Sequence, residues 1–171
     1  MGFVLVLGGA RSGKSDMALR LGLESRRHVT FIATATAGDE EMAERIQRHL
    51  DSRPSGWSTV EAPLDLREAL DSAPDGDFVI VDCLTLWVSN LLGADRRPDE
   101  VLGLGEGAAR AMARHDGVVV SNEVGLGVVP ANDLARVFRD VLGTVNATFA
   151  RHSERSLLLV AGRVLELKPS S

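Results

Sequence analysis

Short runs of consecutive apolar residues recur along the chain and alternate with segments of helical periodicity. Most of the runs are continuous and not alternating, which is typical of strands buried on both faces of a parallel sheet. The predicted strands cover residues 3–7, 29–33, 78–82, 117–121 and 156–161. Because helical segments separate these runs, the pattern predicts an α/β sandwich built from βαβ units.

The clearest predicted helix covers residues 132–149, where apolar residues form one stripe. The stripe consists of Leu134, Val137, Phe138, Val141, Leu142 and Val145. A second helix is predicted at 40–52, with Asp39 as its N-cap, and a third from Pro98 to about Arg114. A helix running to Leu23 should follow the first strand, with Gly22 as its weak point, and residues 164–167 could form an edge strand. Without a repeat or linker, the chain is expected to be one domain, 1–171.

Composition narrows the class of protein. The chain is 44% hydrophobic and 25% charged, as is usual for soluble globular proteins. Its formal net charge of −5 gives no field that would attract nucleic acid or anionic lipid. A single cysteine, Cys83, excludes an intrachain disulfide. The apolar run near Met1 is too short to span a membrane, so we expect no membrane insertion and a cytoplasmic location.

A phosphate-binding motif follows the first predicted strand. The pattern G-x-x-x-x-G-K-[ST] is matched by Gly8, Gly9, Ala10, Arg11, Ser12, Gly13, Lys14 and Ser15. A strand before this loop and a helix after it are the context in which backbone N–H groups surround a polyphosphate. Lys14 would reach the β- and γ-phosphates, and the Ser15 hydroxyl would bind Mg²⁺. The alternative is a glycine-rich turn with no ligand.

Two acidic residues follow predicted strands that should end beside this loop. Asp82 ends the run 78–81, where a carboxylate is the usual second Mg²⁺ position, although strands also often end in a surface or capping Asp. Glu123 begins a loop with two glycines and a proline after the strand 117–121. It is either a base or metal partner at the ligand-binding edge of the sheet, or part of a structural turn.

His49 differs from the other three histidines, which lie in polar stretches. It shares the face of the predicted 40–52 helix with Met42 and Ile46, and arginines lie one turn away on either side. A histidine between arginines near a phosphate site could attack phosphorus directly. The alternative from spacing is a packed, partly buried histidine.

Beyond the loop, several further segments of the sequence carry a resemblance to a known family. They are Ile32–Ala35, Asp39–Met42 with Arg45, Ile46 and His49, Arg53-Pro54, Trp57, Thr59, Glu61, Val81–Trp87, Asn90–Leu92, Ser121–Pro130, Leu134–Arg136, Phe138–Asp140 and Gly143. Together with the loop they resemble the bifunctional adenosylcobinamide kinase/adenosylcobinamide-phosphate guanylyltransferases, which assemble the nucleotide loop of cobalamin.

This resemblance implies a P-loop NTPase-like three-layer α/β sandwich with a mainly parallel sheet, assembled as a homotrimer. In the family a histidine on the helix after the second strand is guanylylated, and His49 is the histidine in the matching block. The resemblance also implies nucleotide contacts at Ala33, Thr34, Ala35, Leu50, Asp51, Ser52, Arg53, Glu61 and Asp82. Leu50 stands where the family commonly has a basic residue.

The implied reactions are phosphorylation of adenosylcobinamide by ATP or GTP and transfer of GMP from GTP to adenosylcobinamide-phosphate. Lys14 and His49 would be catalytic, with Mg²⁺ on Ser15 and Asp82. A single-function small-molecule kinase would also explain the loop and Asp82, but it gives His49 no task. A GTP-dependent switch protein would normally carry an Asn-Lys-x-Asp motif, and the sequence has none.

Overall fold

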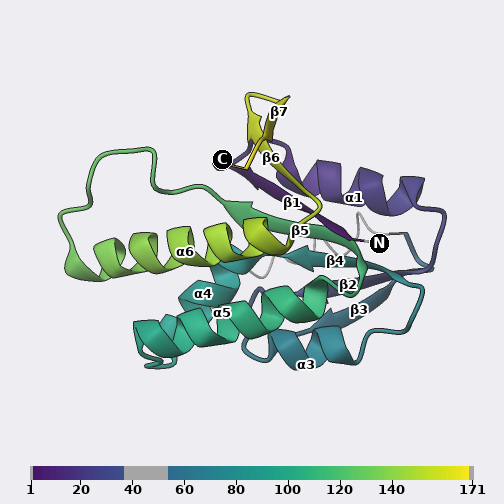
Figure 1. Ribbon diagram of the computed structural model, residues 1–171, viewed down its shortest axis with the longest axis horizontal. Helices are drawn as coiled ribbons and strands as arrows, with labels where there is room; N and C mark the ends of the chain where they lie inside the picture. The colour runs from purple at the N-terminus through teal and green to yellow at the C-terminus, as the bar shows by residue number, and fades with distance from the viewer. Residues whose placement is uncertain (1, 37–53, 170–171) are drawn as a thin grey trace.

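The computed structural model describes residues 2–36 and 54–169, and in this part of the chain seven strands form one sheet (Figure 1). The strands are β1 (Phe3–Gly8), β2 (Val29–Ala33), β3 (Ser58–Glu61), β4 (Phe78–Asp82), β5 (Asp116–Asn122), β6 (Arg155–Val160) and β7 (Arg163–Leu167). Their order is β3-β2-β4-β5-β1-β6-β7. All neighbouring pairs are parallel except β6 and β7. The mainly parallel sheet is therefore confirmed.

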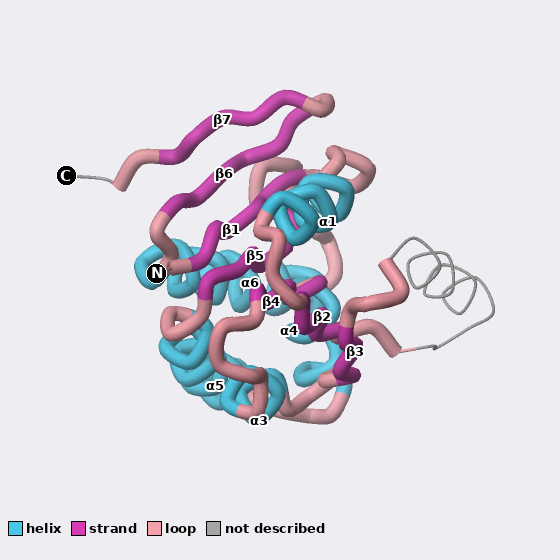
Figure 2. Tube along the Cα trace, turned by 90° about the vertical axis from the view of Figure 1, so that its right-hand side faces the viewer, coloured by secondary structure: helices cyan, strands magenta, loops and turns pink. Residues whose placement is uncertain are grey.

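Helices pack on both faces of the sheet. They are α1 (Lys14–Glu24), α3 (Leu66–Asp71), α4 (Leu84–Gly93), α5 (Pro98–Met112) and α6 (Asp133–His152). Figure 2 shows α1 on one face, with α3, α5 and α6 on the other. This arrangement confirms the predicted three-layer α/β sandwich. None of the helices in the described residues is long and apolar enough to cross a membrane.

The five predicted strands, the helix from Pro98, the 132–149 helix and the edge strand at 164–167 are all present within a few residues of their expected bounds. The sequence prediction missed β3, α3 and α4. The predicted 40–52 helix lies outside the described residues.

Successive residues of a strand point to opposite faces, and because both faces are covered, the predicted strands are apolar at consecutive positions. On β1, Leu5 belongs to the larger core cluster, beneath α3 to α6, whereas Val6 belongs to the smaller cluster, beneath α1. Within the larger cluster the rings of Phe3 and Phe149 meet edge to face, with centroids 6.1 Å apart. The central strands of the sheet are thus buried from both sides, whereas the edge strands β3 and β7 are exposed.

Gly22 is the expected weak point of α1, and the structure leaves no room for a larger side chain at this position. A Cβ at this position would lie 2.7 Å from Cη2 of Trp57 and 2.9 Å from Cδ1 of Ile80. Trp57 comes from the segment just before β3 and packs against the smaller cluster. Glycine therefore lets the β3 side of the molecule contact α1.

Gly22→Ala is expected to lower the free energy of unfolding by about 1 kcal/mol, because overpacking costs more than the helix propensity that alanine adds. Gly103→Ala is the matched control, since Gly103 lies inside α5 with no atom within 4 Å of a new Cβ. That change should raise the free energy of unfolding by about 0.5–1 kcal/mol. Urea denaturation of both variants measures the difference. Equal effects would show that contact with Trp57 and Ile80 does not restrict Gly22.

Candidate active site

The predicted phosphate loop connects β1 to α1 at the carboxyl edge of the sheet. Its glycines allow the sharp turn: Gly13 has a φ of 95° and directly precedes α1. A Cβ on Gly8 would lie 2.5 Å from the carbonyl oxygen of Leu159 and 2.7 Å from Oγ of Ser12. The loop therefore packs closely against β6. The N-terminus of α1 follows it directly, so its backbone N–H groups face an anion bound in the loop.

Lys14 is the first residue of α1, and its side chain lies across the loop. Only 7% of the residue is exposed. Its Nζ donates to the carbonyl of Gly9 at 2.6 Å and to Oγ of Ser12 at 3.4 Å. A loop that already holds the ammonium in place is prepared to neutralise phosphate charge without a large rearrangement.

Three of the predicted nucleotide contacts lie side by side at the ends of neighbouring strands. Ala33 of β2 is in register with Glu61 of β3 on one side and with Asp82 of β4 on the other. The carboxylates of Glu61 and Asp82 therefore come from the strands that flank β2. Ligands of open parallel sheets bind beyond this edge.

Thr34, directly after β2, is fully buried and tightly held. Its Oγ1 donates to the carbonyl of Cys83 at 2.7 Å and accepts from the Cys83 N–H at 2.8 Å. Its carbonyl accepts a bond of 2.7 Å from Nδ2 of Asn90 on α4. Burial, together with the neighbouring Asp82 carboxylate, raises the pKa of the Cys83 thiol to about 11. The thiol is therefore protonated at neutral pH and is no nucleophile.

Glu123 lies next to the phosphate loop, as expected, because its N–H donates to the carbonyl of Gly8 at 3.1 Å. Its carboxylate accepts a 2.6 Å bond from the N–H of Gly125, which is the contact that a structural turn requires. Behind it, the N–H of Asn122 donates to Oγ1 of Thr85, and its carbonyl accepts from Nδ2 of Asn146. The Glu123 loop is thus tied to the phosphate loop, to α4 and to α6.

The donors predicted for Mg²⁺ are one hydroxyl, on Ser15, and one carboxylate, on Asp82. Within the described ranges, no three His, Cys, Asp or Glu side chains are grouped so as to hold a metal ion. Mg²⁺ at a nucleotide site is usually bound by one or two protein oxygens, with phosphates and water completing the octahedron. The two hard oxygen donors therefore fit Mg²⁺ with a nucleotide.

The other described histidines have structural partners. Nδ1 of His28 lies 2.9 Å from Oδ2 of Asp77 at the amino ends of the strands. Partial burial disfavours ionised Asp77, but hydrogen bonds from Thr30 and His28 outweigh it and lower the pKa of the carboxyl. His115 and His152 contact the carbonyl of Leu70 and the Glu106 carboxylate, respectively. The predicted site residues His49, Leu50, Asp51, Ser52 and Arg53 lie outside the described residues.

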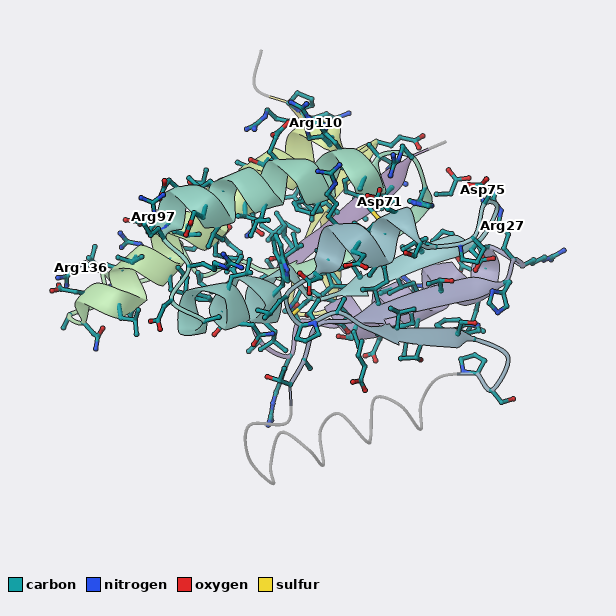
Figure 3. All side chains as sticks on the ribbon, turned by 90° about the horizontal axis from the view of Figure 1, so that it is seen from below. Arg27, Asp71, Asp75, Arg97, Arg110 and Arg136 are labelled. Atoms are coloured by element: carbon teal, nitrogen blue, oxygen red, sulfur yellow. The ribbon has the colours of Figure 1, made fainter. Side chains whose placement is uncertain are left out.

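A groove of about 360 Å³ lies between α3 and α5, on the helical face of the sheet. Arginines line it, among them Arg110, which Figure 3 shows on α5 with Asp71 on α3. Each arginine is paired: Arg67 and Arg114 with Asp71, and Arg110 with Glu106. Because two carboxylates already pair with the three arginines, the groove is a weaker candidate for phosphate than the loop.

Asn90 is the polar residue whose role the sequence did not reveal, although it lay in a block of the family resemblance. The sequence does mark its position: Asn90 is the one amide in α4, a helix whose buried residues are apolar except Thr85. A lone amide in such a helix usually has a specific hydrogen-bonding partner.

A parallel α/β sheet with a lysine-bearing glycine loop between β1 and α1 defines a P-loop nucleotide-binding protein. The RadB recombinase structure is similar in fold, with a TM-score of 0.51 at 16% identity, covering 92% of this chain and 73% of that one. The family model described as "Cobinamide kinase / cobinamide phosphate guanyltransferase" matches residues 4–167, and the chain belongs to this family.

Two relatives are similar over nearly their whole length. The first, from Pseudomonas aeruginosa, is the "Bifunctional adenosylcobalamin biosynthesis protein CobP", 46% identical over 96% of each chain. The second, from Salmonella typhimurium, is the "Bifunctional adenosylcobalamin biosynthesis protein CobU", 40% identical over 96% of this chain and 99% of the relative.

Proposed function

We propose that the protein phosphorylates adenosylcobinamide and then transfers GMP from GTP to the product, through a covalent intermediate on His49. The observation that carries this proposal is the phosphate loop, with Lys14 held inside it, at the same sheet edge as Glu61, Ala33 and Asp82. Family membership adds the two reactions and the corrinoid substrate.

In the kinase step, the hydroxyl of adenosylcobinamide attacks the γ-phosphorus of ATP or GTP. A new O–P bond forms, the hydroxyl proton passes to water, the bond to the β-phosphate oxygen breaks, and the nucleoside diphosphate leaves. Lys14 and the backbone N–H groups of Gly8–Ser15 stabilise the charge on the transferring group. Ser15 and Asp82 would hold Mg²⁺, which neutralises charge on the phosphates when bound.

In the transferase step, a neutral nitrogen of His49 attacks the α-phosphorus of GTP, and pyrophosphate leaves. A phosphate oxygen of adenosylcobinamide-phosphate then attacks the same phosphorus, the P–N bond breaks, and adenosylcobinamide-GDP is formed. Histidine suits this step because it is unprotonated and nucleophilic near pH 7. We assign the remaining GTP contacts to the segment Ala33–Ala35, in which the buried Thr34 would position its two neighbours, and to Leu50–Arg53, Glu61 and Asp82.

An assay with the purified full chain tests both reactions. With adenosylcobinamide, Mg²⁺ and γ-labelled ATP or GTP, label should appear in adenosylcobinamide-phosphate. With α-labelled GTP, label should appear later in adenosylcobinamide-GDP, and α-labelled ATP should give no such product. A labelled first product without the second would favour the single-function kinase instead.

We also propose that the chain forms a homotrimer, as the family resemblance implies. Support comes from five exposed apolar residues on the β5–α6 loop and the first turns of α6, namely Leu126, Val128, Val129, Leu134 and Val137. Val128 is 95% exposed and Leu126 is 80% exposed, on a loop that extends from β5 to the start of α6 (Figure 1). Large apolar side chains left exposed together in one short stretch of the chain are typical of subunit contacts.

Light scattering should give three times the 18.3 kDa of one chain. The double change Leu126→Asp and Val128→Asp is expected to yield monomers, because a buried contact would have to accept two charges. Leu23→Asp, at a 58% exposed position on α1, is the control and should leave the mass unchanged. A trimer that survives the double change would place the contact elsewhere.

A further inference from the structure

Asn90 connects two chain segments that leave the sheet at the candidate site. Its Nδ2 donates to the carbonyl of Thr34 at 2.7 Å and to the carbonyl of Pro63 at 3.1 Å. Thr34 directly follows β2, and Pro63 comes two residues after the end of β3. One side chain on α4 therefore sets the separation between the exits of two neighbouring strands.

An asparagine amide is suited to this task because its nitrogen carries two N–H groups that diverge in one plane. Each N–H serves one carbonyl. An aspartate in the place of Asn90 would have the same shape but no donors, and its negative charge would face two carbonyl oxygens. The interaction therefore depends on the amide and not on the size of the side chain.

Other bonds reinforce the same two segments. The N–H of Ala62 donates to the carbonyl of Ala33 at 2.8 Å, and the N–H of Thr34 donates to the carbonyl of Asp82 at 3.2 Å. Nε1 of Trp87, one turn before Asn90 on α4, donates to the carbonyl of Leu64 at 2.8 Å. Asn90 is the residue in this set whose side chain joins both strand exits.

We propose that Asn90 is a positioning residue that gives the site its preference for guanine over adenine nucleotides. The inference rests on the proposed function, in which Ala33–Ala35 and Glu61 contact GTP. Asn90 would set this preference without touching the nucleotide. It holds Thr34 and Pro63, so that the residues beside them keep a fixed spacing. Distinguishing two purines requires donors and acceptors to be placed within about 0.5 Å. The phosphate loop lies between β1 and α1, and neither Asn90 bond reaches it.

The test compares Asn90→Asp and Asn90→Ala with the matched control Trp87→Phe. The control removes one bond from α4 to the β3 exit and leaves the Thr34 contact intact. Affinities for fluorescent GTP and ATP analogues and the kcat and KM of each reaction are measured on the full chain. Alanine is the safer variant for folding, because it favours helix and leaves a half-buried position that water can enter.

Both Asn90 variants are expected to bind the GTP analogue about tenfold more weakly, with affinity for the ATP analogue and kcat of phosphoryl transfer changed less than about twofold. Equal losses for both nucleotides, no loss, or the same GTP-selective loss in Trp87→Phe would each overturn the proposal. Failure of the proposed function looks different, because the unmodified protein itself would then show no preference for GTP and form no adenosylcobinamide-GDP.

Discussion

Lys14→Met is expected to lower kcat/KM for phosphorylation of adenosylcobinamide by about 10²–10³-fold. Methionine keeps the apolar stem in a position that is 7% exposed, and it removes the ammonium that now bonds to Gly9 and Ser12. Because this charge acts on oxygens whose negative charge grows in the transition state, the loss should fall mainly on kcat. Initial rates with γ-labelled nucleotide measure it.

Arg20→Ala provides the control for the general loss of a cation from α1. Arg20 is exposed and pairs with Glu24 at 3.9 Å, so its removal should leave the rate unchanged. Thermal unfolding of Lys14→Met separates loss of catalysis from loss of the folded loop. A stable Lys14→Met protein with the unmodified rate would remove Lys14 from the mechanism and leave the loop as a turn.

Much of the fold was predictable because the sequence patterns that indicate it lie within short segments of the chain. The runs that correspond to β1, β4 and β5 have apolar residues at consecutive positions because the centre of the sheet is covered on both faces. The phosphate loop could be located because its chemistry needs glycines and a lysine at fixed spacing. The position of Asp82 at the end of β4 followed from the point where the apolar run stops.

The missed features depend on contacts between distant segments. β3 is an exposed edge strand of four residues, so burial imposes no pattern on it. α4 is apolar on most of its surface and follows β4 almost directly, so it shows little periodicity. The alignment of Glu61, Ala33 and Asp82 depends on strand order, which sequence spacing does not contain. For the same reason the two carbonyls bound by Asn90 could not be anticipated.

His49→Ala is expected to abolish covalent labelling of the protein by α-labelled GTP and formation of adenosylcobinamide-GDP. Without the imidazole there is no nitrogen to accept the nucleotidyl group, so the loss should be complete within detection. The label on the unmodified protein should be acid-labile and alkali-stable, as expected of a phosphoramidate. Phosphorylation of adenosylcobinamide should continue in the variant, because that reaction passes directly from nucleotide to substrate at the Lys14 loop.

The other three histidines provide matched controls whose surroundings are known. His28 is held by Asp77 and lies 3.3 Å from Oγ of Ser58, at the amino ends of the strands and therefore opposite the phosphate loop. His115 and His152 contact Leu70 and Glu106 on the helical face. Alanine at each of these positions should leave the label in place. If the label instead persists in His49→Ala and disappears in one of these variants, the nucleophile is that histidine, and the transferase mechanism must be rebuilt around it.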